Sequence, residues 1–360
     1  MSIGSKDRHG PDQARIAATE GLGMRTTELP LVVVLGEQEP PLLDRIKDRA
    51  RLRRVGEPHL ADALRAADAL LVWDFLTDAL PAAWPEEGGP RWVHTASAGV
   101  DKLLFPALLR SDAVITNSRG VFEEPIAEYV AGLVLAMAKD LPGTLDRQRS
   151  RTWQHRATER VAGTRAVVVG GGPIGRAVAR VLGALGLRVT LVSRRARPHD
   201  AEFGRVHGFG ELPGLLPEAD WLVSAAPLTD ETADLFDATL FARMKRGARF
   251  VNVGRGPLVV EDDLVAALHE GRLAGAALDV LRQEPLPADS PLWSVPGLLI
   301  SPHMSADTHG WLEDLAELFL ANFACWAAGR PLRNVVDKTL GYVPVGEAPG
   351  GTPHTEEGSS

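Results

Sequence analysis

The feature that most constrains this chain is a run of glycines between an apolar segment and an amphipathic one. Val167-Val168-Val169 leads directly into GGGPIG at residues 170–175, and the helical pattern RAVARVLGALG follows at once. These glycines fit G-x-G-x-x-G, which lets the backbone turn tightly, approach a pyrophosphate and pack a helix against a strand. The context predicts a dinucleotide-binding loop, and a purely structural glycine turn is the alternative. The predicted cofactor contacts in this loop are Gly170, Gly172, Pro173, Ile174 and Gly175.

The same alternation of apolar and amphipathic segments extends over most of the chain. Between residues 165 and 303 six apolar runs are separated mostly by helical patterns: RAVVVG, LRVTLVS, DWLVSAA, ARFVNVG, AGAALDV and GLLISPH. A first series from Leu31 to Asn117 has the same rhythm. Strands that are apolar on both sides are typical of parallel sheets with helices on both faces. The sequence therefore predicts an α/β protein with two Rossmann-like, doubly wound parallel-sheet domains and a cleft between them.

The domain boundary is expected near residue 124, where a long helical pattern, EPIAEYVAGLVLAMAKDL, begins. Pro125 and the acidic residues beside it suit the first turn of a helix. A last helix from Trp311 to Ala328 is followed by PLRNVV, which can return the chain to the first domain. The predicted parts are a substrate-binding, flavodoxin-like domain (29–124 and 310–338), a dinucleotide-binding Rossmann domain (125–309) and disordered tails (1–28 and 339–360).

Charge and composition exclude several classes of protein. The 360 residues include 39 Lys and Arg against 47 Asp and Glu, a net charge of −8, which disfavours nucleic acid as a partner. No apolar stretch reaches the length of a bilayer span and no signal segment is recognisable, so we expect no membrane contact and a cytoplasmic location. The single cysteine, Cys325, allows no intrachain disulfide and no cysteine-based zinc site. We expect no metal centre.

The tip of the second predicted strand of the dinucleotide-binding unit indicates the cofactor. An acidic residue near this position binds the ribose 2′-hydroxyl of NAD, but here Ser193 stands 18 residues after Gly175 and is followed by Arg194 and Arg195. Two guanidinium groups and a hydroxyl suit a 2′-phosphate, because arginine offers a planar fork of donors that stays charged. The sequence therefore predicts NADP(H) in preference to NAD(H). A solvated surface cluster of these arginines with Arg197 is the alternative.

Polar residues follow three further predicted strands, at the edge where open α/β sheets bind ligands. They are Arg255 in VNVGRGPLVV, Asp279 and Glu284 in LDVLRQEPLP, and His303 in LISPHMSAD. A histidine exchanges a proton with an alcohol or carbonyl oxygen, and a nearby carboxylate orients it. An arginine binds a substrate carboxylate and polarises the adjacent carbonyl. We therefore predict that Glu284 orients His303 and that Arg255 holds the substrate, with structural roles as the alternative.

Five segments together make the chain resemble the D-isomer-specific 2-hydroxyacid dehydrogenase family. They are GGGPIG at 170–175, P-x-T-x-x-T from Pro227 to Thr232, MKRGARFVNVGRG at 244–256, DVLRQEPLP at 279–287 and SPH at 301–303. Their order and spacing agree with the family from about residue 90 to 335. The chain departs from the family pattern at Gly254, where Ala or Ser is frequent. It also departs after His303, where MSAD replaces the frequent paired glycines.

The resemblance implies reversible hydride transfer between nicotinamide C4 and the C2 atom of a 2-oxo acid. It assigns the catalytic roles to Arg255, Glu284 and His303. His303 would protonate the nascent alkoxide, Glu284 would keep it poised, and Arg255 would bind the carboxylate and the carbonyl oxygen. Further implied cofactor contacts are Pro227, Thr232, Asp279 and His303, and the implied substrate contacts are Ser97, Ala98, Gly99, Arg255 and His303.

A homodimer built through the cofactor domain is implied as well, with the helix at 125–140 as a contact. Trp153 lies where family members extend an arm toward a partner subunit, and filling a core is its alternative role. Arg119, in the segment Ser118-Arg119-Gly120, is expected either to meet a substrate anion or to lie in solvent.

The leading hypothesis is an NADPH-preferring reductase of small 2-oxo acids, with glyoxylate and hydroxypyruvate as the expected substrates. A phosphoglycerate dehydrogenase without a regulatory domain and an inactive paralogue are alternatives. Glu284 disfavours formate dehydrogenase, which pairs its histidine with an amide. A dinucleotide-sensing scaffold resembling the C-terminal-binding-protein corepressors also fits, because such proteins share the fold and the same Arg, Glu and His.

Overall fold

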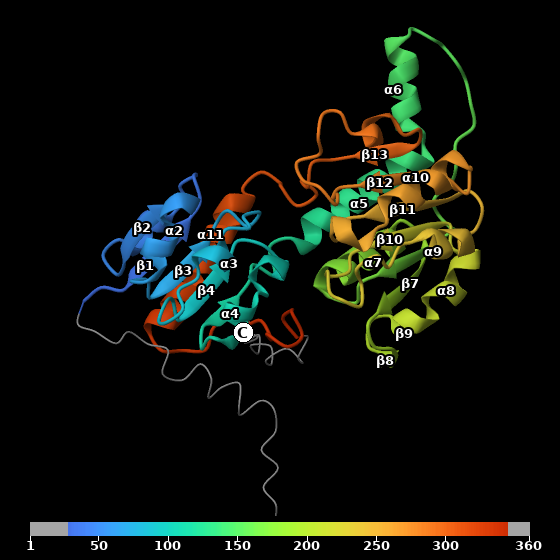
Figure 1. Cartoon of the computed structure of the whole chain (residues 1–360). Helices are drawn as coiled ribbons and strands as arrows, with labels where there is room; N and C mark the ends of the chain where they lie inside the picture. The colour runs from blue at the N-terminus through green and yellow to red at the C-terminus, as the bar shows by residue number, and fades with distance from the viewer. Residues whose placement is uncertain (1–27, 345–360) are drawn as a thin grey trace, which may run out of the picture.

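The computed structural model describes residues 28–344, which form two lobes, each built around one β-sheet (Figure 1). The chain completes the first sheet, crosses to the second lobe before helix α5 (Glu123–Ala138) and returns before helix α11 (Trp311–Ala327). The predicted α/β class with two parallel sheets is thereby confirmed. The exact domain limits stay a prediction.

The first sheet has five parallel strands in the order β2-β1-β3-β4-β5. Their bounds are β1 Leu31–Leu35, β2 Arg51–Val55, β3 Ala69–Val72, β4 Trp92–Thr95 and β5 Val114–Thr116. The central strands are buried runs of apolar residues, as expected for strands with helices on both faces. Strand β2, RLRRV, was not predicted, because four of its five residues are exposed at the sheet edge and it carries no apolar signal.

The second sheet has eight strands in the order β13-β12-β11-β10-β6-β7-β9-β8. Their bounds are β6 Arg165–Val169, β7 Arg188–Ser193, β8 Arg197–Asp200, β9 Gly204–Gly208, β10 Trp221–Ser224, β11 Ala248–Asn252, β12 Leu273–Leu278 and β13 Leu298–Ile300. All six predicted strands are present. The polar strands β8 and β9 were missed, and β8 pairs antiparallel with β9, so the sheet is not purely parallel.

Helices cover both faces of each sheet. The α-helices are α2 Leu60–Leu64, α3 Leu80–Ala83, α4 Pro106–Arg110, α5 Glu123–Ala138, α6 Leu141–Arg149, α7 Pro173–Ala184, α8 Leu212–Leu215, α9 Ala238–Arg243, α10 Glu261–His269 and α11 Trp311–Ala327. Short 3-10 helices cover Leu43–Ile46, Glu57–His59, Asp101–Leu103, Phe209–Glu211, Leu216–Glu218, Gly256–Leu258 and Pro291–Ser294. In residues 28–344 no helix combines the length and apolarity needed to cross a membrane.

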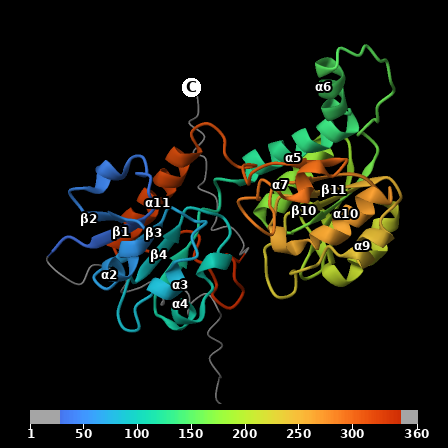
Figure 2. The same ribbon diagram turned by 45° about the horizontal axis from the view of Figure 1, so that its top comes forward.

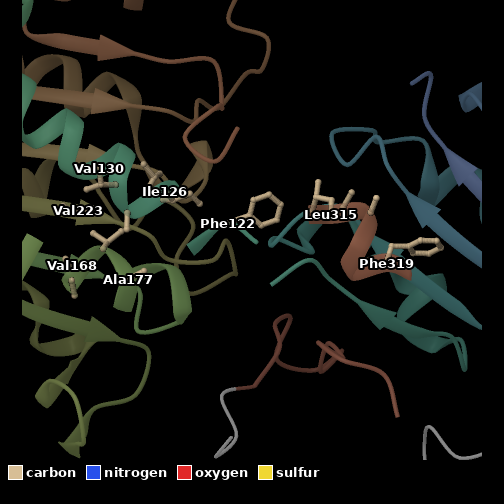
Figure 3. Packing of buried hydrophobic residues seen from close by; sticks show 14 of the residues in the cluster. Phe122, Ile126, Val130, Val168, Ala177, Val223, Leu315 and Phe319 are labelled. Atoms are coloured by element: carbon tan, nitrogen blue, oxygen red, sulfur yellow. The ribbon is translucent and has the colours of Figure 1, made fainter. Parts of the chain in front are cut away.

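The alternation of side chains along β6 explains how the second sheet is covered on both sides. Val168 belongs to the apolar cluster that includes α5 and α7, whereas Val167 and Val169 belong to the cluster that includes α9 and α10. The first of these clusters continues into the other lobe. Figure 3 shows Phe122 between the side chains around α5 and those of Leu315 and Phe319 on α11. The two lobes therefore share buried apolar contacts where the chain crosses.

Two local predictions were wrong. The long helix predicted through residue 141 ends at Ala138, because Asp140 adopts a left-handed conformation and its carboxylate caps the separate helix α6. Most of the predicted tails, at residues 1–27 and 345–360, lies outside the described residues. Residues 338–341, however, form a turn that is closed by the bridge between Asp337 and Tyr342, so the disorder predicted from residue 339 onward was wrong for residues 339–342.

Helix α6 and the segment after it project from the second lobe (Figures 1 and 2). The side chain of Trp153 in this segment is fully exposed, so it fills no core of its own chain. An arm toward a partner subunit stays the prediction for this segment.

Candidate active site

The glycine loop lies between β6 and α7, and its three pattern glycines have different surroundings. A Cβ atom on Gly170 would lie 2.4 Å from the Ala225 carbonyl oxygen, and one on Gly175 would lie 1.7 Å from the Gly170 carbonyl oxygen. Gly172, the N-cap of α7, has open space where its Cβ would stand. Pro173 and Ile174 begin the helix. Two glycines thus permit close packing, while the third leaves a helix N-terminus accessible to a phosphate group.

The tip of strand β7 brings Ser193 and its neighbours beside this loop. A Cβ on Gly171 would lie 2.5 Å from the Ser193 Cβ, and the Ser193 hydroxyl donates to the Arg195 carbonyl at 2.6 Å. Arg194 is half-buried and Arg195 is exposed. Within the described residues neither guanidinium forms an ion pair with a carboxylate. Both charges therefore remain available to an anion.

Asp200 is the carboxylate nearest in sequence to this tip, but it is already occupied. Arg176 donates two hydrogen bonds to it at 2.8 Å, and Arg197 donates one at 3.3 Å. The hydrogen bond from Arg176 holds the pKa of Asp200 well below its ordinary value, although burial acts in the opposite direction. Arg197 therefore belongs to the fold rather than to an anion site, and Asp200 is not free to accept from a ribose hydroxyl.

The segment from Pro227 to Thr232 follows β10 as a tight loop. The buried Thr232 hydroxyl donates to the Pro227 carbonyl at 2.7 Å and accepts from the Thr229 N–H at 2.8 Å. Thr232 thus fixes the loop, whereas Pro227 is exposed. A cofactor contact by either residue stays a prediction.

The segment that carries His303 follows β13 and is organised by Asp279. This buried carboxylate accepts from the Ser301 hydroxyl at 2.6 Å and from the N–H groups of Met304 and Ser305 at 3.0 Å each. His303 itself has φ of 53° and donates its N–H to the Asp279 carbonyl at 2.8 Å. A non-glycine residue in this left-handed region is strained and persists only when its surroundings hold it. Asp279 provides that support.

The side chains of His303 and Glu284 meet at this edge of the sheet. The His303 Nδ1 atom lies 2.8 Å from Glu284 Oε2, and each side chain is about a quarter exposed. The other carboxylate oxygen, Oε1, accepts from the Leu281 N–H at 2.8 Å. Burial raises the pKa of Glu284, but the hydrogen bonds from His303 and Leu281 and the charge of Arg255 together lower it below its ordinary value. An ionised Glu284 accepts the Nδ1 proton, which leaves Nε2 to face a substrate oxygen.

Arg255 connects the two lobes. It follows β11 and lies in the second lobe, but its Nε atom donates to Asp101 of the first lobe at 3.0 Å. Its Nη1 atom donates to the Gly254 carbonyl at 2.9 Å. A Cβ on Gly99 would stand 1.6 Å from Nη2, so the guanidinium lies directly against this glycine.

The loop from Ser97 to Gly99 is held in shape by its own polar groups. The Ser97 hydroxyl donates to the Gly99 carbonyl at 2.7 Å, and Asn117 donates to the Ala98 carbonyl at 2.6 Å. The N–H groups of Ala98 and Gly99 have no acceptor among residues 28–344. Free N–H donors beside a guanidinium form a site that suits a carboxylate.

The structure thus brings most of the predicted residues together at facing edges of the two sheets. Arg255 lies against the Ser97–Gly99 loop, and Glu284 pairs with His303. Arg119 instead approaches the Pro344 carbonyl at 3.5 Å. Sequence reasoning missed Asp101 as the partner of Arg255, because 154 residues separate them and only the three-dimensional contact identifies the pair.

The sequence of this chain is similar to that of a known enzyme family. The profile of the D-isomer specific 2-hydroxyacid dehydrogenase family, NAD binding domain, matches residues 131–305. Glyoxylate/hydroxypyruvate reductase B of Citrobacter koseri is 34% identical over 253 residues, which cover 69% of this chain and 78% of the relative.

Two solved structures are similar over most of the chain. A D-isomer specific 2-hydroxyacid dehydrogenase family protein from Aeromonas salmonicida has a TM-score of 0.75 and 34% identity, covering 86% of this chain and 100% of that one. An NADPH-dependent glyoxylate/hydroxypyruvate reductase from Sinorhizobium meliloti, in complex with NADP and sulfate, has a TM-score of 0.75 and 27% identity, covering 88% and 100%.

Proposed function

This chain belongs to the D-isomer specific 2-hydroxyacid dehydrogenase family, and we propose that it reduces glyoxylate and hydroxypyruvate with NADPH. As a family member it is an NAD(P)-dependent dehydrogenase that acts on CH–OH donors. The proposal adds the substrates, the preferred cofactor and the roles of individual residues. The observation that carries it is the His303–Glu284 contact of 2.8 Å in the same site as Arg255, whose charge acts on the Glu284 carboxyl.

Each polar group of the site has a distinct role in this proposal. Arg255 and the free N–H groups of Ala98 and Gly99 bind the substrate carboxylate, and the guanidinium polarises the neighbouring C2 carbonyl. His303 donates its Nε2 proton to the oxygen that forms the alcohol, and Glu284 stabilises the positive charge that His303 carries before the transfer. Because Asp101 already neutralises part of the Arg255 charge, substrate binding includes an exchange of partners at Arg255.

The cofactor is held at the other end of the same sheet edge. When bound, NADPH supplies the hydride that reaches the C2 carbon of the substrate. The open N-terminus of α7 at Gly172 fits the pyrophosphate. The guanidinium groups of Arg194 and Arg195, which form no ion pair with a carboxylate among residues 28–344, fit the 2′-phosphate. The complex of the Sinorhizobium meliloti reductase with NADP supports this preference. The relatives named glyoxylate/hydroxypyruvate reductase support small 2-oxo acids.

Initial rates of NADPH and NADH oxidation, measured separately with glyoxylate, hydroxypyruvate, pyruvate and phenylpyruvate, test the proposal. We expect turnover with the first two acids and a higher kcat/KM for NADPH. Dinucleotide binding without turnover of any acid would instead favour the sensing scaffold. Preference for NADH would remove the assigned role of Arg194 and Arg195.

A variant with Arg194→Ala and Arg195→Ala tests the cofactor site directly. A hydrogen bond to a charged group contributes about 1.5–3 kcal/mol, so the dissociation constant for NADPH should rise by roughly 30-fold. Binding of NADH should change little. Arg188→Ala is the matched control, because Arg188 is exposed at the opposite end of the same strand β7. Equal weakening of both cofactors would contradict the 2′-phosphate assignment.

A further inference from the structure

The last described residues of the chain are fixed to the first lobe. The Val336 N–H donates to the Ile115 carbonyl at 2.9 Å, next to the end of β5. The Lys338 ammonium donates to the carbonyls of Leu108 and Ser111 at 3.0 and 2.7 Å. The turn that follows is closed by two N–H groups that donate to the Asp337 carboxylate and by the bridge between Asp337 and Tyr342. Residues 336–342 are therefore part of the first lobe.

One side chain of this turn reaches the second lobe. The Arg194 guanidinium carbon lies 5.7 Å from the centre of the Tyr342 ring, which is within the range of a cation–π contact. In both overall views the last described residues lie on the side of the first lobe that faces the second (Figures 1 and 2). The contact therefore connects the tip of β7 with the C-terminal segment.

The kind of partner that holds Arg194 matters for its charge. Arg197, three residues later, is bonded to the Asp200 carboxylate, which neutralises it. An aromatic ring instead attracts a guanidinium through the electrons of its face, without adding a negative charge and without accepting in the plane of the N–H groups. Tyr342 can thus fix the orientation of Arg194 and leave its donors free for an anion.

We propose that Tyr342 is a positioning residue of the NADP(H) site, which orients Arg194 toward the 2′-phosphate. This inference rests on the proposed function, because it needs Arg194 to bind that phosphate. It makes the C-terminal segment of the first lobe part of a cofactor site that otherwise belongs to the second lobe. Because only NADPH carries the phosphate that Arg194 binds, the contact between Tyr342 and Arg194 should favour the binding of NADPH over that of NADH.

The test compares Tyr342→Leu with Tyr342→Phe in the full-length protein, by measuring dissociation constants for NADPH and NADH separately. Leucine removes the ring, and we expect the NADPH dissociation constant to rise about threefold, the factor that a partly exposed cation–π contact contributes. The NADH dissociation constant should be unchanged, which also reports an intact fold of the shared cofactor site. Phenylalanine keeps the ring face and should retain the affinity of the unmodified protein for NADPH.

A double variant separates this inference from the proposed function. If Tyr342 acts through Arg194, adding Tyr342→Leu to Arg194→Ala should cause no further loss of NADPH affinity. Additive losses, equal losses for both cofactors, or no loss in Tyr342→Leu would overturn the inference while leaving the role of Arg194 intact. If Arg194→Ala leaves the ratio of the NADPH and NADH dissociation constants unchanged, Arg194 does not bind the 2′-phosphate. The proposed cofactor preference and this inference would then both be wrong.

Discussion

One histidine in each lobe is hydrogen-bonded to other side chains, and the partners differ. Hydroxyl groups contact the ring of His94, whereas a carboxylate contacts the ring of His303. His94 on β4 is fully buried, and its ring lies 2.8 Å from the Thr116 hydroxyl and 3.3 Å from the Ser118 hydroxyl. His303, after β13, is about a quarter exposed and lies 2.8 Å from the Glu284 carboxylate. The residue type is the same, but burial of His94 favours its neutral ring, whereas Nδ1 of His303 faces a carboxylate at the edge of the sheet.

The hydrogen bonds around His94 fit a neutral ring with its proton on Nε2. The Ser118 hydroxyl donates to the Thr95 carbonyl at 2.8 Å, so it accepts the Nε2 proton of His94. The Thr116 hydroxyl accepts from Trp92 Nε1 at 2.8 Å and donates to His94 Nδ1. Burial lowers the pKa of His94 from 6.5 to about 3. This histidine therefore stabilises the fold as a neutral group, and at physiological pH its ring keeps the single proton on Nε2.

The comparison shows that burial and partner, rather than residue type, decide whether a histidine can transfer a proton. Removing the imidazole of His303 is the most direct test of this conclusion. In His303→Ala we expect kcat for 2-oxo acid reduction to fall by about 10³-fold, because a positioned general acid contributes 10²–10⁴-fold. Steady-state kinetics measure this loss, and the NADPH dissociation constant should change less than about twofold.

The exposed His309 provides the control, since His309→Ala removes a histidine six residues later without touching the Glu284 pair. If His303→Ala weakened NADPH binding as much as it lowered kcat, the role of His303 would be to maintain the structure of the site and not to donate a proton.

The partner of His303 gives the second prediction. Glu284→Gln keeps an acceptor for the Leu281 N–H but removes the negative charge, and kcat for reduction should fall by roughly 30-fold at pH 7.5. Glu284 has a lowered pKa and stays ionised in the unmodified enzyme, so it should set no acidic limb above pH 5. A kcat within about threefold of the unmodified enzyme would contradict the assignment, because the hydrogen bond to a charged group would then contribute almost nothing.

The corresponding change at His94 should affect stability and not catalysis. Thr116→Val leaves both Trp92 Nε1 and His94 Nδ1 without their partner in a buried place, at a cost of about 2 kcal/mol in the free energy of unfolding. Urea denaturation measures this loss, and kcat should stay within twofold. Thr116→Ser keeps the hydroxyl and should recover most of the stability. A large loss of kcat in a stably folded Thr116→Val protein would place His94 in the chemistry.

Sequence reasoning predicted what depends on apolar runs and on local motifs. The six apolar strands of the second sheet, the glycine loop and the polar residues that follow the strands could be predicted from the sequence. Strands β2, β8 and β9 could not, because their exposed, charged side chains resemble those of loops.

Contacts between residues far apart in the chain were also beyond the sequence. The pairing of Arg255 with Asp101 and the contact of Arg194 with Tyr342 depend on how the two lobes meet. The two histidines teach the same lesson. Nothing within the sequence segment of His94 indicates that the hydroxyls of Thr116 and Ser118 and the distant ring of Phe319 pack against it.

The smallest expected effect concerns pH and stability. Because the folded pKa of His94 lies below its unfolded value of 6.5, the unfolded chain binds a proton there that the folded protein does not. The contribution of a neutral His94 is therefore complete above pH 6.5 and is lost as the pH falls toward 3. One such proton lowers the free energy of unfolding by up to about 1.4 kcal/mol per pH unit. Urea denaturation at pH 7.5, 6.0 and 5.0 measures this slope.

In His94→Gln the slope between pH 6.5 and 5 should be flatter by about this amount, whereas His309→Gln, which changes an exposed histidine, should keep the slope of the unmodified protein. The pH window excludes most carboxylates, whose ordinary pKa values lie below 5. Equal slopes in all three proteins would mean that His94 takes up a proton within the folded state. Burial would then not keep His94 neutral, and it could not explain why His94 has a structural role while His303 transfers a proton.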